Sequence, residues 1–264
     1  MLPALDDFRA RVVANAEINE GDLVLDVGAG DGLIAFAALE HVGELGRVIF
    51  SDVSDALLAE CKRLANELGV LDRCEFVYAS ADALPFDSES VDVVTTRSVL
   101  IYLMDKAPAF REFHRVLRGG GRLSIFEPIN IFGHEHSHGL YYGLDVSPVR
   151  HLADKIITRW KGPDEHPLLN FDERDLFRLA REAGFSEVQM DYRAELKLEE
   201  WTKSWETFLR SSGNPLDPTP EEEIKEALEP GEQVEFEAYV RTMVESRPRI
   251  PQWRAGAYLQ ALKG

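Results

Sequence analysis

The stretch Leu23-Val24-Leu25-Asp26-Val27-Gly28-Ala29-Gly30-Asp31-Gly32-Leu33 decides the fold of this chain. Its first five residues have the apolar character of a buried strand, and glycines follow at alternate positions. A parallel strand that turns sharply into a helix, with a nucleotide against the backbone of the turn, needs glycine there because side chains would obstruct the ligand. The stretch therefore predicts a nucleotide-cofactor site at a strand-to-helix turn.

An acid closes the next predicted strand, residues 47–52, at Asp52. Parallel strands end at one sheet edge, and the two oxygens of a carboxylate there can accept hydrogen bonds from both hydroxyls of a ribose. We therefore expect Asp52 to hold the cofactor ribose. The alternative is an acid that only favours the start of the following helix.

The spacing of the glycines bears on the kind of nucleotide. Nicotinamide and flavin enzymes use G-x-G-x-x-G at this place. Counted from Gly28, the position of the last small residue is Leu33, and the third glycine comes one residue early at Gly32. A nicotinamide-dependent oxidoreductase is therefore the less favoured alternative.

Five segments, in the expected order, make the chain resemble the class I methyltransferases that use S-adenosylmethionine. They are residues 25–32, 51–54, 81–86, 91–94 and 116–121. Within that family the chain is most similar to small-molecule enzymes such as those of ubiquinone and menaquinone biosynthesis. The resemblance covers residues 10–127 well, and 171–196 and 253–263 loosely. It implies S-adenosylmethionine as cofactor and methyl transfer by in-line displacement to a small organic acceptor.

The resemblance also implies which residues contact the cofactor. The methionine part would lie against Asp26, Gly28, Ala29 and Gly30, the ribose and adenine face against Asp52 and Val53, and the adenine edge against Ala81, Asp82 and Ala83. Asp82 has a second interpretation as a solvated turn acid. Arg97 would lie at the methionine end, or would form an ion pair with Asp26 or Glu127. Arg11 is a weaker candidate for the methionine carboxylate.

Strand and helix patterns alternate along the chain. Strands are predicted at 22–27, 47–52, 74–79, 91–96, 121–127, 187–196 and 255–262, and helices at about 31–41, 54–69, 105–118 and 172–183. Ser54 and Asp105 are predicted helix N-caps, and Gly69 and Gly119 predicted helix ends. The pattern predicts an α/β fold with a doubly wound, mostly parallel seven-stranded sheet, the Rossmann-like fold of methyltransferases.

Two long insertions interrupt this pattern. We expect residues 1–127, 171–196 and 253–264 to form the cofactor-binding core, and residues 128–170 and 197–252 to form a helical substrate cap. One helix of the second insertion is expected to carry Trp201, Trp205 and Phe208. Chains leave parallel strands at the edge where ligands bind, so both insertions should begin over the cofactor.

Catalytic residues are harder to name, because an activated methyl donor requires mainly that donor and acceptor be held close and dry. The candidates are Tyr102, Glu127, His134 and His136. Tyr102 either contacts the sulfonium by a cation–π interaction or belongs to the core. Glu127 is either a base or a cap for local backbone.

The segment 133–139 holds His134, His136 and His138. In an extended loop these side chains would share one face, as in a zinc site. No further group at ligand spacing supports a metal, so we expect none. A lid loop with one histidine as base, or a solvated turn, is favoured instead.

The composition limits the partners. A net charge of −18 disfavours nucleic acid, because phosphate backbones are bound by lysine and arginine. The chain has no apolar run of membrane-spanning length, and residues 1–10 lack the pattern of a signal peptide. Two cysteines are too few for a disulfide framework, which favours the cytoplasm. The sequence predicts a cytoplasmic methyltransferase, with a non-catalytic cofactor-binding protein as the alternative.

Overall fold

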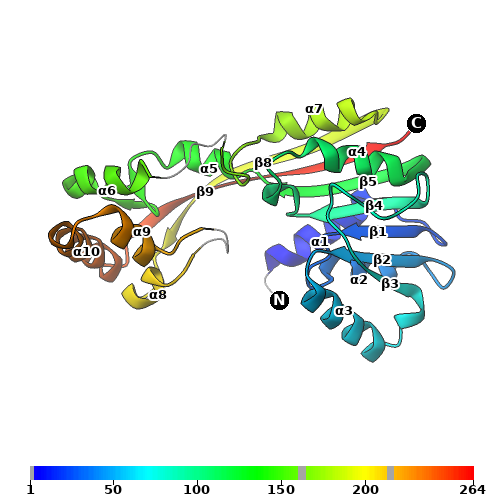
Figure 1. Cartoon of the computed structure of the whole chain (residues 1–264), viewed down its shortest axis with the longest axis horizontal. Helices are drawn as coiled ribbons and strands as arrows, with labels where there is room; N and C mark the ends of the chain where they lie inside the picture. Colours follow the sequence, from blue (N-terminus) through cyan, green and yellow to red (C-terminus); the bar gives the residue numbers. More distant parts are fainter. Residues whose placement is uncertain (1–2, 160–164, 213–216) are drawn as a thin grey trace. The chain divides into compact units, whose positions relative to one another are not determined.

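The computed structural model describes residues 3–159, 165–212 and 217–264 (Figure 1). The chain forms two compact units. Unit 1 contains residues 1–129, 167–193 and 256–264, and unit 2 contains residues 130–166 and 194–255. Each unit has its own elements and its own hydrophobic core, so we describe them in turn.

Unit 1 is built on the seven-stranded sheet. Its strands are β1 (Leu23–Val27), β2 (Arg47–Asp52), β3 (Cys74–Tyr78), β4 (Val91–Arg97), β5 (Leu117–Pro128), β8 (Glu187–Glu200) and β9 (Arg249–Leu262), in the order β3-β2-β1-β4-β5-β9-β8. The strands β1 to β5 are parallel, and β9 is antiparallel to β5 with Arg122 opposite Leu262. The predicted α/β fold with a mostly parallel sheet is confirmed. The strand order reverses between β1 and β4, and ligands bind outside the strand ends at such a point.

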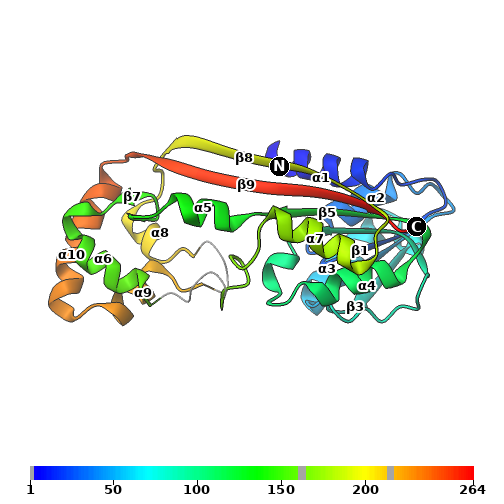
Figure 2. The ribbon, with the colours of Figure 1, turned by 90° about the horizontal axis from the view of Figure 1, so that it is seen from above.

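Helices cover both faces of this sheet (Figure 2). They are α1 (Pro3–Asn15), α2 (Leu33–Leu39), α3 (Asp55–Glu67), α4 (Ala107–Val116) and α7 (Glu173–Ala183), with the short 3₁₀ helices η1 (Leu71–Arg73) and η2 (Leu100–Tyr102). The helices α2 and α3 share an apolar cluster with β1 and β2, in which the Phe50 ring lies 5.0 Å from Phe36 and 4.9 Å from Phe76. On the other face, α4 packs against α7.

The helix boundaries differ from the predicted ones for local reasons. Helix α2 begins at Leu33 and not near residue 31, because Gly32 has φ +82° and cannot continue a right-handed helix. Ser54 caps α3 as predicted, and Gly69 follows its end with φ +70°. The prediction that Gly119 ends a helix is wrong, since this residue lies inside β5. Lys106 holds the N-cap position predicted for Asp105, whose side chain accepts a hydrogen bond from the Ala107 amide.

Unit 2 is mainly helical. It contains α5 (Asn130–His136), α6 (Arg150–Ile157), α8 (Trp205–Leu209), α9 (Pro220–Ala227) and α10 (Pro230–Glu245), with the 3₁₀ helix η3 (Ser147–Val149) and a hairpin of β6 (Leu140–Tyr141) and β7 (Leu144–Asp145). Strands β8 and β9 also extend into it. The prediction that one helix carries Trp201, Trp205 and Phe208 is wrong for Trp201. This residue precedes α8, and its backbone amide donates to the Pro248 carbonyl at 2.9 Å.

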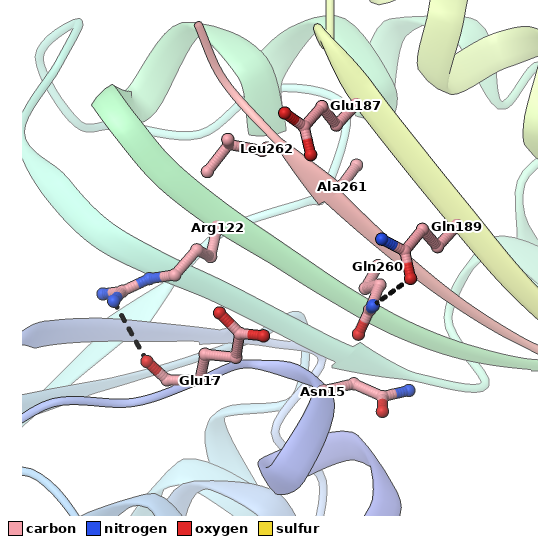
Figure 3. Close-up of a pocket in the computed structure, with 8 residues that line it drawn as sticks. All are labelled: Asn15, Glu17, Arg122, Glu187, Gln189, Gln260, Ala261 and Leu262. Carbon is pink, nitrogen blue, oxygen red and sulfur yellow. Dashed lines mark hydrogen bonds between the residues drawn. The ribbon is translucent and has the colours of Figure 1, made fainter.

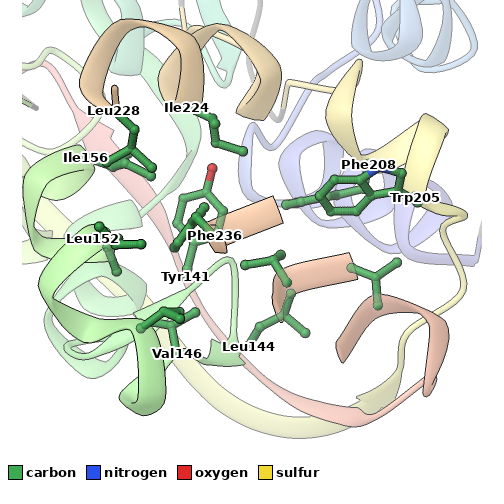
Figure 4. Packing of buried hydrophobic residues seen from close by; sticks show 14 of the residues in the cluster. Tyr141, Leu144, Val146, Leu152, Ile156, Trp205, Phe208, Ile224, Leu228 and Phe236 are labelled. Atoms are coloured by element: carbon green, nitrogen blue, oxygen red, sulfur yellow. The ribbon is translucent and has the colours of Figure 1, made fainter. Parts of the chain in front are cut away.

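A separate hydrophobic cluster holds unit 2 together (Figure 4). Phe236 is fully buried in it, and its ring centroid lies 5.2 Å from that of Tyr141. Trp201 and Trp205 belong to the same cluster. Burial of each large apolar side chain stabilises a fold by roughly 1.5–3 kcal/mol, so such a cluster is the main source of stability of this unit.

We predict that Phe236→Ala lowers the free energy of unfolding by about 3–5 kcal/mol, because it leaves a cavity in this cluster. Val234→Ala is the matched control on the same helix, since Val234 is 70% exposed. Its effect should stay within about 0.5 kcal/mol. Urea unfolding followed by tryptophan fluorescence reports on the cluster directly. Equal shifts for the two variants would contradict this account of the unit 2 core.

Candidate functional site

The glycine turn after β1 combines two different needs for glycine. Gly28 and Gly32 have φ +68° and +82°, and a Cβ atom on either would lie 2.2 Å from Val99 Cγ2 or 2.5 Å from Phe36 Cε2. These two glycines therefore serve packing. Gly30 has φ +57°, but the nearest atom to its built Cβ is the Gly28 carbonyl oxygen at 4.0 Å. Only Gly30 borders open space, which leaves room for a ligand against the turn.

Asp52 ties this turn to the end of β2. Its Oδ2 accepts a hydrogen bond from the Gly30 amide at 2.8 Å, and its Oδ1 accepts one from the Ser54 amide at 2.9 Å. The cap of α3 is Ser54, whose Oγ accepts from the Leu57 amide. Asp52 is therefore not the helix cap. Each carboxylate oxygen can accept a second hydrogen bond, so the acceptors that a ribose needs are present.

Asp26 lies buried one strand away. The Thr95 hydroxyl donates to its Oδ1 at 2.7 Å. Burial raises the pKa of Asp26 to about 7, although this hydrogen bond, one from the Ala35 amide and the charge of Arg97 all favour the ionised form. Arg97 itself is partly exposed, and its guanidinium has no ion pair with any described residue, including Asp26 and Glu127. It remains available to an anionic ligand.

Four further predicted residues, Val53 and residues 81–83, follow the ends of β2 and β3. Val53 is 60% exposed. The Ala83 amide donates to the Ser80 carbonyl at 3.1 Å, and the Ser80 hydroxyl donates to the Asp82 carboxylate. Ala81 is buried, whereas Asp82 and Ala83 are exposed. The exposure of Asp82 fits both an adenine contact and a solvated turn, so its role stays a prediction.

Glu127 caps backbone and faces no solvent. Its carboxylate accepts hydrogen bonds from the amides of Val99 at 2.8 Å, Leu100 at 2.9 Å and Ile101 at 3.3 Å. Burial raises its pKa to about 7, opposed by these three hydrogen bonds and by the charge of Lys106. Of its two interpretations, the structure shows the capping of local backbone.

Tyr102 follows directly in η2. Leu100 and Ile101 are buried beneath it, but Tyr102 is 48% exposed and Met104 is 53% exposed. Tyr102 is therefore not a core residue. Its position after the end of β4 places it on the ligand edge of the sheet.

The histidine segment is partly helical. His134 and His136 lie in α5 and not in an extended loop, because a helix spans residues 130–136. The His136 ring stacks on Trp253 at 4.6 Å, and its Nδ1 lies 2.7 Å from the Phe132 carbonyl oxygen. Within the described residues there is no group of three or more potential metal ligands. A role for either histidine as a base stays a prediction.

Other polar groups lie away from this edge. Arg11 forms ion pairs with Asp7 and Asp191, so it is committed within the protein. A polar hollow is lined by Asn15, Glu17, Arg122, Glu187, Gln189, Gln260, Ala261 and Leu262 (Figure 3). None of the predicted site residues lines it. In the part of the chain that the structure describes, no helix has the length and apolar character to cross a membrane.

Sequence reasoning missed two residues that support the ligand edge. Cys61, a buried residue of α3, donates from Sγ to the Gly30 carbonyl at 3.3 Å. Lys106 is buried beneath the segment that follows β4. Neither lies in a sequence pattern that distinguishes it from an ordinary surface or core residue, because their partners are distant along the chain.

Comparison with known proteins agrees with this geometry. The model of the ubiE/COQ5 methyltransferase family matches residues 5–194. The ubiquinone/menaquinone biosynthesis C-methyltransferase UbiE of Cronobacter sakazakii is 30% identical over 184 residues, 65% of this chain and 69% of that protein. Its namesake from Francisella philomiragia is 29% identical over 196 residues, 69% and 74% of the two chains. The YcgJ protein of Bacillus subtilis has a TM-score of 0.63 at 18% identity, with 98% of each chain covered, which supports the fold alone.

We predict that Gly30→Ala weakens cofactor binding and destabilises the fold no more than its control does. The matched control is Gly69→Ala, whose φ of +70° and empty surroundings resemble those of Gly30. A left-handed alanine costs roughly 1–2 kcal/mol at both positions. Calorimetric titration with S-adenosylhomocysteine should show affinity lowered at least about 10-fold, the equivalent of 1.4 kcal/mol, only for Gly30→Ala. Unchanged affinity in that variant would show that the cofactor does not bind against this turn.

The buried Asp26 predicts a specific pH dependence of stability. Its pKa rises from 3.8 to about 7, so between these values the native state holds a proton that the unfolded state has released. The free energy of unfolding therefore falls as pH rises through this range. Asp26→Asn removes the part of this fall that Asp26 causes, about 1.4 kcal/mol of unfolding free energy per unit of pKa shift. The similar fall caused by Glu127 is present in both the wild type and the variant. Urea unfolding at about pH 4 and pH 7 measures it, and identical pH slopes would contradict it.

Proposed function

We propose, from the premise that this chain belongs to the ubiE/COQ5 methyltransferase family, that it methylates a carbon atom of a small ring-containing acceptor. Family membership establishes methyl transfer from S-adenosylmethionine to a small-molecule acceptor. The observation that carries the assignment of the site is the open space at Gly30 beside the Asp52 carboxylate. The name of the relatives as C-methyltransferases supports carbon as the methylated atom.

The residues at the ligand edge fit the cofactor. Asp52 has free lone pairs for the ribose hydroxyls, and the exposed Val53 offers an apolar surface to the adenine. Arg97, without a partner in the described residues, would bind the methionine carboxylate, and Asp26 would favour the ammonium and sulfonium charges. Ala81, Asp82 and Ala83 would border the adenine edge. When bound, the cofactor supplies a methyl group activated by its sulfonium.

The residues of the chain then have to position the acceptor and exclude water. Tyr102 and Met104 are exposed at the end of β4, where they would contact the acceptor beside the methyl group. A ring whose acidic hydroxyl ionises in solution would enter as an anion with its own nucleophilic carbon. The methyl group would move from sulfur to that carbon as the neutral thioether leaves, and the ring would regain its hydroxyl when the proton on that carbon passes through solvent to the oxygen. The buried Glu127 need not act as a base for this reaction. The cation–π contact of Tyr102 with a sulfonium would favour the donor in the same place.

Unit 2 is the proposed source of acceptor specificity. The family match ends at residue 194, while unit 2 continues to residue 255. The family match therefore includes most of unit 1 and the first segment of unit 2, and residues 195–255 lie outside it. We therefore assign unit 2 the role of a substrate cap. The proposal also includes a reducing compartment such as the cytoplasm, since Cys61 and Cys74 are free thiols, and no nucleic-acid partner.

The decisive experiment incubates the protein with a metabolite extract and cofactor that carries a deuterated methyl group. We expect mass spectrometry to find a product with the whole labelled methyl group attached to ring carbon, which fragmentation distinguishes from oxygen or nitrogen. Asp52→Asn should lower product formation about 10–100-fold, since a hydrogen bond to a charged group contributes about 1.5–3 kcal/mol. Asp55→Asn, an exposed acid three residues away, is the control. A label on a heteroatom, or cofactor binding without any product, would overturn the proposal.

A further inference from the structure

The segment after β4, residues 98–104, carries the two exposed side chains assigned to the acceptor. It starts in an unfavourable conformation, because Ser98 is a non-glycine residue with φ +58°. The Ser98 amide donates to the Phe126 carbonyl at 2.9 Å, which attaches the start of the segment to β5. A strained backbone of this kind persists only where the surrounding structure holds it in place.

Two buried charges of opposite sign hold this segment. Glu127 accepts from the amides of Val99, Leu100 and Ile101, as described above. Lys106 is 4% exposed, and its Nζ donates to the Leu103 carbonyl at 2.7 Å. The carboxylate thus binds the amides of the first half of the segment, and the ammonium binds a carbonyl of the second half.

A second stretch of unit 1 completes the contact. Lys106 Nζ also donates to the Pro167 carbonyl at 3.2 Å and to Asn170 Oδ1, and it lies 4.5 Å from the centre of the Phe171 ring. The Asn170 side chain in turn donates from Nδ2 to the Met104 carbonyl at 2.8 Å. Asn170 therefore joins the ammonium to the backbone of a residue that we assign to the acceptor.

This arrangement is costly as a source of stability alone. Removing two charges from water costs several kcal/mol for each ion, and well-packed apolar residues are often at least as stabilising as a buried pair. Burial lowers the pKa of Lys106 to about 8, opposed by the charge of Glu127, which reflects that cost. What the two charged groups provide and apolar groups cannot is a fixed direction for four backbone groups of one segment, and Asn170 fixes a fifth.

We propose that Glu127, Lys106 and Asn170 are positioning residues for methyl transfer, which fix the backbone of residues 99–104 so that Tyr102 and Met104 hold the acceptor in line with the methyl group. They act through that segment and touch neither cofactor nor acceptor. The proposal rests on the proposed function, which places the acceptor at Tyr102 and Met104. In this proposal the three residues position only the acceptor. The affinity for the cofactor should therefore not depend on Asn170.

Asn170 provides the sharpest test because two substitutions separate its two bonds. Asn170→Ala removes both, whereas Asn170→Asp keeps the acceptor for Lys106 and loses only the donor to the Met104 carbonyl. Asn19→Ala is the matched control. The side-chain Nδ2 of Asn19 also donates to a main-chain carbonyl, that of Glu17, in the turn before β1. Each variant is examined as the full chain by hydrogen exchange, by titration with S-adenosylhomocysteine and by methyl transfer to the acceptor that the labelled-methyl experiment identifies.

We expect Asn170→Ala to speed amide exchange in residues 98–104 but not in residues 23–33. Its kcat/KM for the acceptor should fall about 10–100-fold, as small misplacements near a reacting group do, with affinity for S-adenosylhomocysteine within about 3-fold of wild type. The exchange rates and the kcat/KM of Asn170→Asp should lie between those of Asn170→Ala and the wild type. Those of Asn19→Ala should equal the wild-type values.

Exchange and cofactor titration need no acceptor, so they separate this proposal from the proposed function. Unchanged exchange in residues 98–104 overturns the positioning role whatever the acceptor is. Faster exchange with unchanged kcat/KM also overturns it, and leaves the proposed function standing. Loss of cofactor affinity in Asn170→Ala would show a general structural role and would overturn it as well. Absence of product with the wild-type protein overturns the proposed function instead.

Discussion

The hydrogen bond from the Gly30 amide to the Asp52 carboxylate is the contact on which the proposed cofactor site depends. It joins the turn after β1 to the end of β2, the two strands on one side of the point where the sheet order reverses. The turn can reach Asp52 only because Gly28, Gly30 and Gly32 adopt positive φ angles. One carboxylate thereby shapes the backbone of the turn and still presents acceptors to a ligand.

Buried carboxylates serve different purposes around this edge. Asp26 is held by a neighbouring hydroxyl and lies near Arg97, so its charge can respond to a cationic ligand. Glu127 accepts hydrogen bonds from three backbone amides, which fix the orientation of its carboxylate. Burial raises the pKa of both to about 7, yet their partners differ: the Thr95 hydroxyl donates to Asp26, and three backbone amides donate to Glu127. A perturbed pKa in a cleft is therefore insufficient to name a catalytic base.

The parts predicted from sequence are those fixed by local rules. Apolar runs, the glycine turn, the Ser54 cap and the acid at the end of β2 depend on residues close together in the chain, and the strand alternation fixes the sheet. The prediction of Gly119 as a helix end failed because strand pairing with β4 extends β5 back to Leu117. Lys106 was missed because two of its three hydrogen-bond partners, Pro167 and Asn170, lie more than sixty residues away. Long-range partners of this kind leave no local pattern.

The family match ends at the point where the chain passes from unit 1 into the second segment of unit 2. The match covers strands β1 to β5 and stops where β8 enters unit 2. Unit 2 has its own apolar cluster and its own buried tyrosine–glutamate contacts, with the Tyr141 hydroxyl 2.9 Å from Glu223. Because its stability comes from these internal contacts, its surface can change without disturbing the glycine turn. In the proposed function, in which unit 2 is the substrate cap, this separation would let the acceptor change while the cofactor site stays the same.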